Sequence, residues 1–79
     1  MNIKILGSGC ANCEKLEALA KQAAEDLNVD ATFLKVKKID DILDYGIART
    51  PGLVIDEVVK SSGRIPSLDE IKKWIQEAK

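Results

Sequence analysis

The sequence predicts an α/β fold with the element order βαβαββα. Three observations predict it. A short apolar run leads through glycines into a long amphipathic pattern, and a second strand-like run followed by a helical pattern repeats that order. The second half begins at a proline that precedes two short strand-like runs and a last amphipathic helix. Seventy-nine residues with 46% hydrophobic content fit one small globular domain, so residues 1–79 are expected to form a single domain.

Charge and hydropathy exclude two classes of partner. The net charge is −1, which gives no basic surface for nucleic acid. No apolar stretch approaches the ~20 residues of a membrane span, so no membrane partner is expected. Met1 leads almost directly into a strand pattern and leaves no room for a signal peptide. We therefore expect a cytoplasmic protein, in a compartment where a catalytic disulfide is more plausible than a structural one.

Both cysteines of the chain stand between the first strand and the first helix. Residues 2–6 read as a short strand in which Ile3, Ile5 and Leu6 are apolar and Lys4 interrupts the run, as in a strand that is buried on both faces. Gly7 and Gly9 then turn the chain toward Cys10 and Cys13 at the start of a helix. Free N–H groups and the helix dipole favour a negative charge there, and the thiolate is both the nucleophile and the metal ligand. The residues alone leave a thiol–disulfide redox centre and a soft-metal site open.

The first helix is expected over residues 11–27, with one apolar stripe and one charged side. Glu17 and Lys21 form a favourable i,i+4 pair on the charged side. Cys13 lies on the apolar stripe, whereas Cys10 precedes the helix, so one thiol should be shielded and the other exposed. The stripe consists of Cys13, Leu16, Ala20, Ala23, Ala24 and Leu27.

The middle of the chain repeats the strand–helix order. Residues 31–36 read as a strand, and residues 39–45 as a short helix with acidic residues at its N-terminal end and Gly46 at its C-terminal end. Its apolar positions keep helical spacing. A strand–helix–strand order favours crossover connections and parallel neighbouring strands. These apolar positions are Ile39, Ile42, Leu43 and Ile47.

The last third reads as a β-hairpin followed by a capped helix. Thr50-Pro51-Gly52 precedes a strand at residues 53–55. Residues 58–61 form the second strand of the hairpin, and the turn between the two strands lacks the usual Asn-Gly or Asp-Gly signal. Ser67 and Glu70 have the spacing of a capping box, which predicts a helix from residue 68 onward. Its apolar positions are Leu68, Ile71, Trp74, Ile75 and Ala78.

With Cys-x-x-Cys after the first strand and Thr-Pro before the third, the chain resembles the small thioredoxin/glutaredoxin-like redox-active disulfide proteins of archaea and bacteria. The matching stretches are residues 3–13, 50–56 and 63–67. The resemblance implies a thioredoxin-like fold with a four-stranded mixed sheet flanked by helices. It also implies a thiol–disulfide oxidoreductase that uses a redox-active disulfide and no cofactor or metal. Its partners would be a disulfide-containing protein or a low-molecular-weight thiol, together with a reductase, and the protein would be a monomer.

The resemblance also implies roles for individual residues. Cys10 would be the attacking thiol and Cys13 the resolving thiol. Pro51 would follow a cis peptide bond and lie against the pair, with Thr50 contacting substrate. The family further places the loop at Gly63 beside the site. Supporting positions are Gly9, which stands where larger thioredoxins carry tryptophan, and Ala11 and Asn12, which are expected to stabilise the Cys10 thiolate.

Two alternatives remain at this point. The stretch at residues 7–13 is also similar to the loop of small copper chaperones, and two thiolates suit Cu(I). However, Ser8 stands where those domains usually hold methionine, and they end in a strand rather than in a helix. A domain whose cysteines merely pack would suit Cys13 but not Cys10, which lies beside glycine.

Overall fold

The computed structural model describes residues 1–7, 11–47 and 49–78, and it has the predicted βαβαββα order. The boundaries agree with the sequence pattern to within one or two residues. None of the helices in these ranges is long and apolar enough to cross a membrane. The elements are β1 (Asn2–Leu6), α1 (Ala11–Asp26), β2 (Thr32–Val36), α2 (Ile39–Asp44), β3 (Gly52–Ile55), β4 (Val58–Ser62) and α3 (Leu68–Ala78).

The four strands form one mixed sheet, as the family resemblance implied, and their order in it is β2-β1-β3-β4. β1 runs parallel to β2, because α1 carries the chain back across one face between them. β3 runs antiparallel to β1 and to β4. β1 is therefore a central strand, and β2 and β4 are the edges. The N–H of Gly7 still donates to the carbonyl of Val36, at 2.9 Å, so the β1–β2 ladder extends to the turn before the cysteines.

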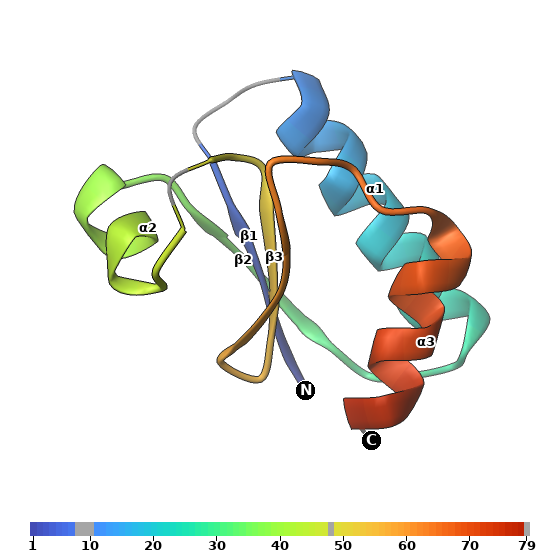
Figure 1. The fold of residues 1–79 in the computed structure, drawn as a ribbon. Helices are drawn as coiled ribbons and strands as arrows, with labels where there is room; N and C mark the ends of the chain where they lie inside the picture. The colour runs from blue at the N-terminus through green and yellow to red at the C-terminus, as the bar shows by residue number, and fades with distance from the viewer. Residues whose placement is uncertain (8–10, 48, 79) are drawn as a thin grey trace.

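Helices α1 and α3 cover one face of the sheet and α2 lies on the other (Figure 1). The main core lies under α1 and α3, where alternate residues of β1 and β3 meet the predicted apolar stripe of α1. Leu27, which we expected on that stripe, is only partly buried, since it lies just past the helix end. The buried residues of this cluster are Ile3, Ile5, Leu16, Ala20, Ala23, Ala24, Leu53, Ile55, Ile71 and Ile75.

The second face has a smaller core, because α2 spans only six residues. Leu6 and Val54 of the sheet pack there against Ile42 and Ile47. The other two apolar positions of the predicted α2 pattern, Ile39 and Leu43, are 72% and 55% exposed. The helical spacing of the apolar residues thus predicted α2 correctly. A helix as short as α2 buries only a narrow stripe of its surface, so not every apolar position is covered.

The turn between β3 and β4 is held by contacts with β1. Asp56 and Glu57 both have positive φ, 48° and 69°, as the two central residues of a type I′ hairpin turn require. The Asp56 N–H donates to the carbonyl of Asn2 at 2.7 Å, and the Asp56 carboxylate accepts from the Asn2 N–H at 2.8 Å. These tertiary bonds explain how a hairpin forms without glycine in its turn.

Helix α3 begins with the predicted capping box. The Ser67 Oγ accepts from the Glu70 N–H at 3.2 Å, and the Glu70 carboxylate accepts from the Ser67 N–H at 3.3 Å. Arg64 adds an ion pair to the same carboxylate at 2.8 Å. Hydrogen bonding from Arg64, and then from the backbone of Ser67, lowers the pKa of Glu70 to about 2.

We predict that Glu70 makes the stability of the domain pH-dependent in acid. The folded pKa is about 2 and the ordinary value is 4.5. The stabilisation from this carboxylate is therefore fully present above pH 4.5 and is lost as the pH falls toward 2. Glu70→Gln should lower the melting temperature at pH 7, and the difference from the parent protein should shrink between pH 4.5 and pH 2. Thermal unfolding across that range measures it.

Glu77→Gln on the same helix is the matched control, because no ion pair of Glu77 is seen in the described residues. A Glu70→Gln deficit that stays constant from pH 7 to pH 2 would contradict the prediction.

Candidate functional site

Cys13 lies in the first turn of α1 with its side chain turned into the protein. It is 6% exposed, as the apolar stripe predicted, and its thiol is not free in this structure. Ala11 and Asn12, the first residues of the helix, are exposed. Cys10 and Gly9 lie outside the described residues, and so does Ser8. The described part of the site therefore consists of the shielded sulfur and the walls around it.

Gly7 forms the closest wall of the Cys13 side chain. A Cβ atom at Gly7 would lie 2.3 Å from the Cys13 Sγ and 3.5 Å from the Thr50 Cβ. A side chain on residue 7 would therefore occupy the space of the sulfur. The same geometry places Thr50 next to Cys13, although they are 37 positions apart in the chain. Among the predicted site residues, these two are brought together at the end of β1.

Thr50 and Pro51 are joined by a cis peptide bond, as the family resemblance implied. Pro51 is buried at the start of β3, whereas Thr50 is exposed. The Gly63 N–H donates to the Pro51 carbonyl at 2.9 Å, which fixes the loop after β4 beside the proline. Gly63 has a positive φ of 73°, and the Arg49 side chain packs over its Cα. Thr50 and Gly63 are thus the exposed residues on either side of the buried Pro51.

A small cavity of about 100 Å³ opens beside the Cys13 side chain. Lys35 and Lys37 line it from β2 and the residue after it, and Glu14 lines it from α1. Lys35 also pairs with Glu17 at 3.3 Å. The sequence interpretation missed these lysines. The available signal was topological, because the carboxyl ends of two parallel neighbouring strands meet at the same edge of a sheet.

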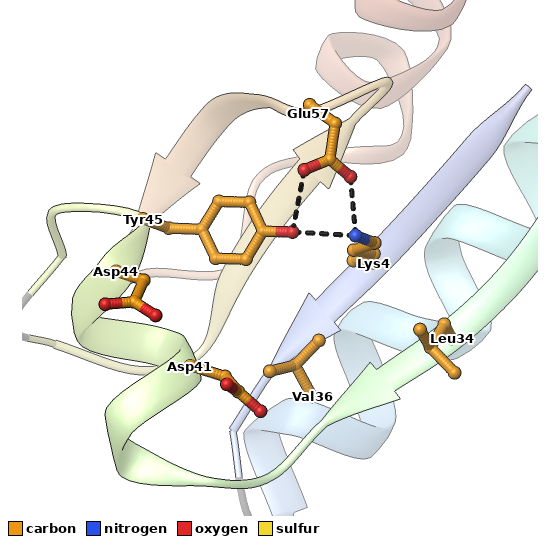
Figure 2. Close-up of a pocket in the computed structure, with 7 residues that line it drawn as sticks. All are labelled: Lys4, Leu34, Val36, Asp41, Asp44, Tyr45 and Glu57. Atoms are coloured by element: carbon orange, nitrogen blue, oxygen red, sulfur yellow. Dashed lines mark hydrogen bonds and ion pairs between the residues drawn. The ribbon is translucent and has the colours of Figure 1, made fainter.

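The sequence interpretation also missed a polar network on the α2 face. The Lys4 ammonium donates to the Tyr45 hydroxyl at 2.7 Å and pairs with Glu57 at 2.5 Å, while the Tyr45 hydroxyl donates to Glu57 at 3.0 Å (Figure 2). These contacts, the Glu57 hydrogen bond first, raise the pKa of Lys4. The same bond from Lys4 lowers the pKa of Glu57. Tyr45 thus links α2, β1 and the β3–β4 turn.

The described residues form no cluster of metal ligands. Within residues 1–7, 11–47 and 49–78, no three or more histidine, cysteine, aspartate or glutamate side chains gather where they could hold a metal ion. The two-thiolate copper site considered from the sequence requires Cys10, which lies outside these ranges.

We predict that Gly7→Ala destabilises the oxidised protein more than Gly46→Ala does. Both glycines have positive φ, 151° and 79°, so both substitutions strain the backbone. Only at Gly7 does the new methyl group collide, because Gly46 has nothing within 4 Å of its Cβ position. We expect a loss of about 3 kcal/mol for Gly7→Ala and about 1 kcal/mol for Gly46→Ala, measured by urea unfolding. Equal losses would mean that the contact with Cys13 does not constrain residue 7.

Comparison with known proteins places this geometry in a family. A family model described as "Thioredoxin domain" matches residues 1–76. A protein named "Thioredoxin" from Methanothermobacter thermautotrophicus is 48% identical over 73 residues, which cover 92% of this chain and 95% of that protein. A second "Thioredoxin", from Methanocaldococcus jannaschii, is 38% identical over 74 residues, which cover 94% of this chain and 85% of the relative.

A solved structure has the same fold. Thioredoxin 1 from the thermophilic eubacterium Thermosipho africanus superimposes with a TM-score of 0.62 over 99% of this chain and 98% of that one, at 16% sequence identity. The match of the family model to nearly the whole chain, and the identity to the two archaeal relatives, decide the assignment: the chain belongs to the thioredoxin family.

Proposed function

We propose that Cys10 and Cys13 are the redox-active pair through which this chain exchanges thiols and disulfides. As a member of the thioredoxin family, the chain is a thiol–disulfide oxidoreductase. One observation carries the assignment of the pair. The Cys13 sulfur is shielded at the N-terminus of α1, pressed against Gly7 and adjacent to the cis Thr50–Pro51 segment.

The proposed reaction has two displacement steps. The Cys10 thiolate attacks one sulfur of a substrate disulfide, which forms a Cys10–substrate disulfide and releases the other substrate sulfur as a thiolate. Cys13, after losing its proton, then attacks the Cys10 sulfur. This forms the Cys10–Cys13 disulfide and releases the second substrate thiolate. Two electrons pass from the dithiol to the substrate, and two protons restore the two product thiols.

The positions of the two cysteines suit these different roles. Cys10 precedes α1, where the helix N-terminus and the backbone at Ala11 and Asn12 favour a thiolate. Gly9, the residue before it in the sequence, carries no side chain. Cys13 is shielded, so an external disulfide is attacked by Cys10 first. The shielding of one sulfur therefore sets the order of the two steps.

We further propose that substrate lies along Thr50, Pro51 and Gly63. Thr50 is exposed and adjacent to Cys13, and the Gly63–Pro51 hydrogen bond holds the two loops together. An extended peptide that runs past Thr50 would bring its disulfide to the end of β1. This arrangement needs no bound cofactor, because the electrons are carried by the two sulfurs.

The proposed partners follow from that chemistry. One is a disulfide-bearing protein or a low-molecular-weight thiol, and the other is a reductase that returns two electrons to the Cys10–Cys13 disulfide. Residues 1–79 would act as one monomeric domain. A disulfide that must be reduced again after each turnover suits the cytoplasm, where thiols are kept reduced.

We predict that Cys13→Ser traps a mixed disulfide and that Cys10→Ser does not. Without the second thiol, the Cys10–substrate disulfide has no intramolecular route to release. The reduced variants are incubated with insulin, and the covalent adducts are counted by intact-protein mass spectrometry. We expect the adduct to dominate for Cys13→Ser and to be at least tenfold scarcer for Cys10→Ser, because Cys13 is shielded.

The two variants are matched controls for each other, since each removes one sulfur. Insulin reduction in the presence of dithiothreitol should fall to the uncatalysed rate for Cys10→Ser. A larger adduct on Cys10→Ser than on Cys13→Ser would reverse the assigned roles. Full turnover by the double variant would overturn the proposal that this pair carries the exchange.

A further inference from the structure

The face of the sheet that carries α2 is only partly covered. α1 and α3 cover the opposite face, whereas α2 lies to one side of its own face (Figure 1). A cavity of about 430 Å³ lies between α2 and the sheet. Because β2 is an edge strand, the cavity can be reached from one side without displacing another strand. Its lining residues are Lys4, Leu34, Val36, Asp41, Asp44, Tyr45 and Glu57.

The cavity combines apolar walls with carboxylates. Leu34 and Val36 of β2 form one side, and Leu34 is 54% exposed, which is high for a large apolar side chain on a sheet face. Figure 2 shows Asp41 and Asp44 on the α2 side, with Asp41 toward Val36 and the Tyr45 hydroxyl toward Lys4 and Glu57. A ligand that fills this cavity would therefore meet apolar surface and negative charge together.

The negative charge of the cavity is not balanced from within. Lys4 is already bonded to Glu57 and to the Tyr45 hydroxyl. Asp41 and Asp44 take part in none of the ion pairs formed by the described residues. The last turn of α2 also contains no basic residue to offset Asp44 at the negative end of the helix. The cavity lining carries three carboxylates against one ammonium group.

We propose that this cavity is a docking site for an arginine side chain of a partner protein. The methylene stem of arginine would cover Leu34 and Val36, and its planar guanidinium would bond to Asp41 and Asp44 and stack on Tyr45. Arginine fits better than lysine, because its five donors can reach two carboxylates at once and its charge is more weakly hydrated. The charge complementarity selects a partner with a basic, protruding residue.

This site is separate from the dithiol. Cys13 belongs to α1, on the other face of the sheet, so the docking does not require the proposed exchange reaction. A partner held at this cavity would contact the edge strand β2 and helix α2.

The test is a titration followed by ¹⁵N chemical shifts, with the uncharged-ended peptide Ac-Gly-Arg-Leu-Arg-Gly-NH₂ as the probe. We expect saturable shifts at residues 34–36, 41–45 and 57. Replacing both arginines by glutamine should weaken binding at least tenfold. Replacing both by lysine should weaken it severalfold.

Asp41→Asn with Asp44→Asn should weaken binding at least tenfold and leave insulin reduction unchanged. Asp40→Asn is the matched control, because Asp40 lies on the same helix, carries the same charge and does not line the cavity. An equal loss for Asp40→Asn would overturn the proposal in favour of diffuse electrostatic attraction. Shifts that do not saturate, or that remain with the glutamine peptide, would also overturn it.

Discussion

The close contact between Gly7 and the Cys13 sulfur determines how the rest of the site is built. β1 is a central strand, so its end meets α1 on one side and β3 on the other. With no side chain at residue 7, the first turn of α1 can approach the strand end, and Thr50 can approach from β3. A larger residue there would push the helix and the cis-proline segment apart. The geometry of the site thus depends on a missing side chain.

Contacts with β1 also explain a turn that local preference does not favour. Two non-glycine residues with positive φ cost about 1 kcal/mol each in an isolated hairpin. In the protein, Asp56 is bonded twice to Asn2, and Glu57 is bonded to Lys4 and Tyr45. The bonds to Asn2 and Lys4 join the turn to β1, and the bond to Tyr45 joins it to the end of α2. The hairpin is therefore stabilised by contacts with the rest of the protein, rather than by the local preference of its turn residues.

Features that are determined by residues close together in the sequence could be predicted from the sequence. The strand at 2–6, the stripe of α1 and the capping box at Ser67 each arise from spacing within one element, and each was confirmed. The Lys4 network could not be predicted in the same way, because its members lie 12 to 53 positions apart and meet only through the sheet order. The cis bond at Pro51 was expected only from the family resemblance, since spacing alone allows either isomer.

The side chains of β1 point alternately to the two faces of the sheet, so this one strand contributes to two separate surfaces. Ile3 and Ile5 face the core under α1, whereas Lys4 and Leu6 face α2. Lys4 accordingly lines the α2 cavity, whereas Ile5 lines the small cavity beside the Cys13 side chain. A small domain can in this way hold a partner on one face of its sheet while the sulfur chemistry proceeds at the other.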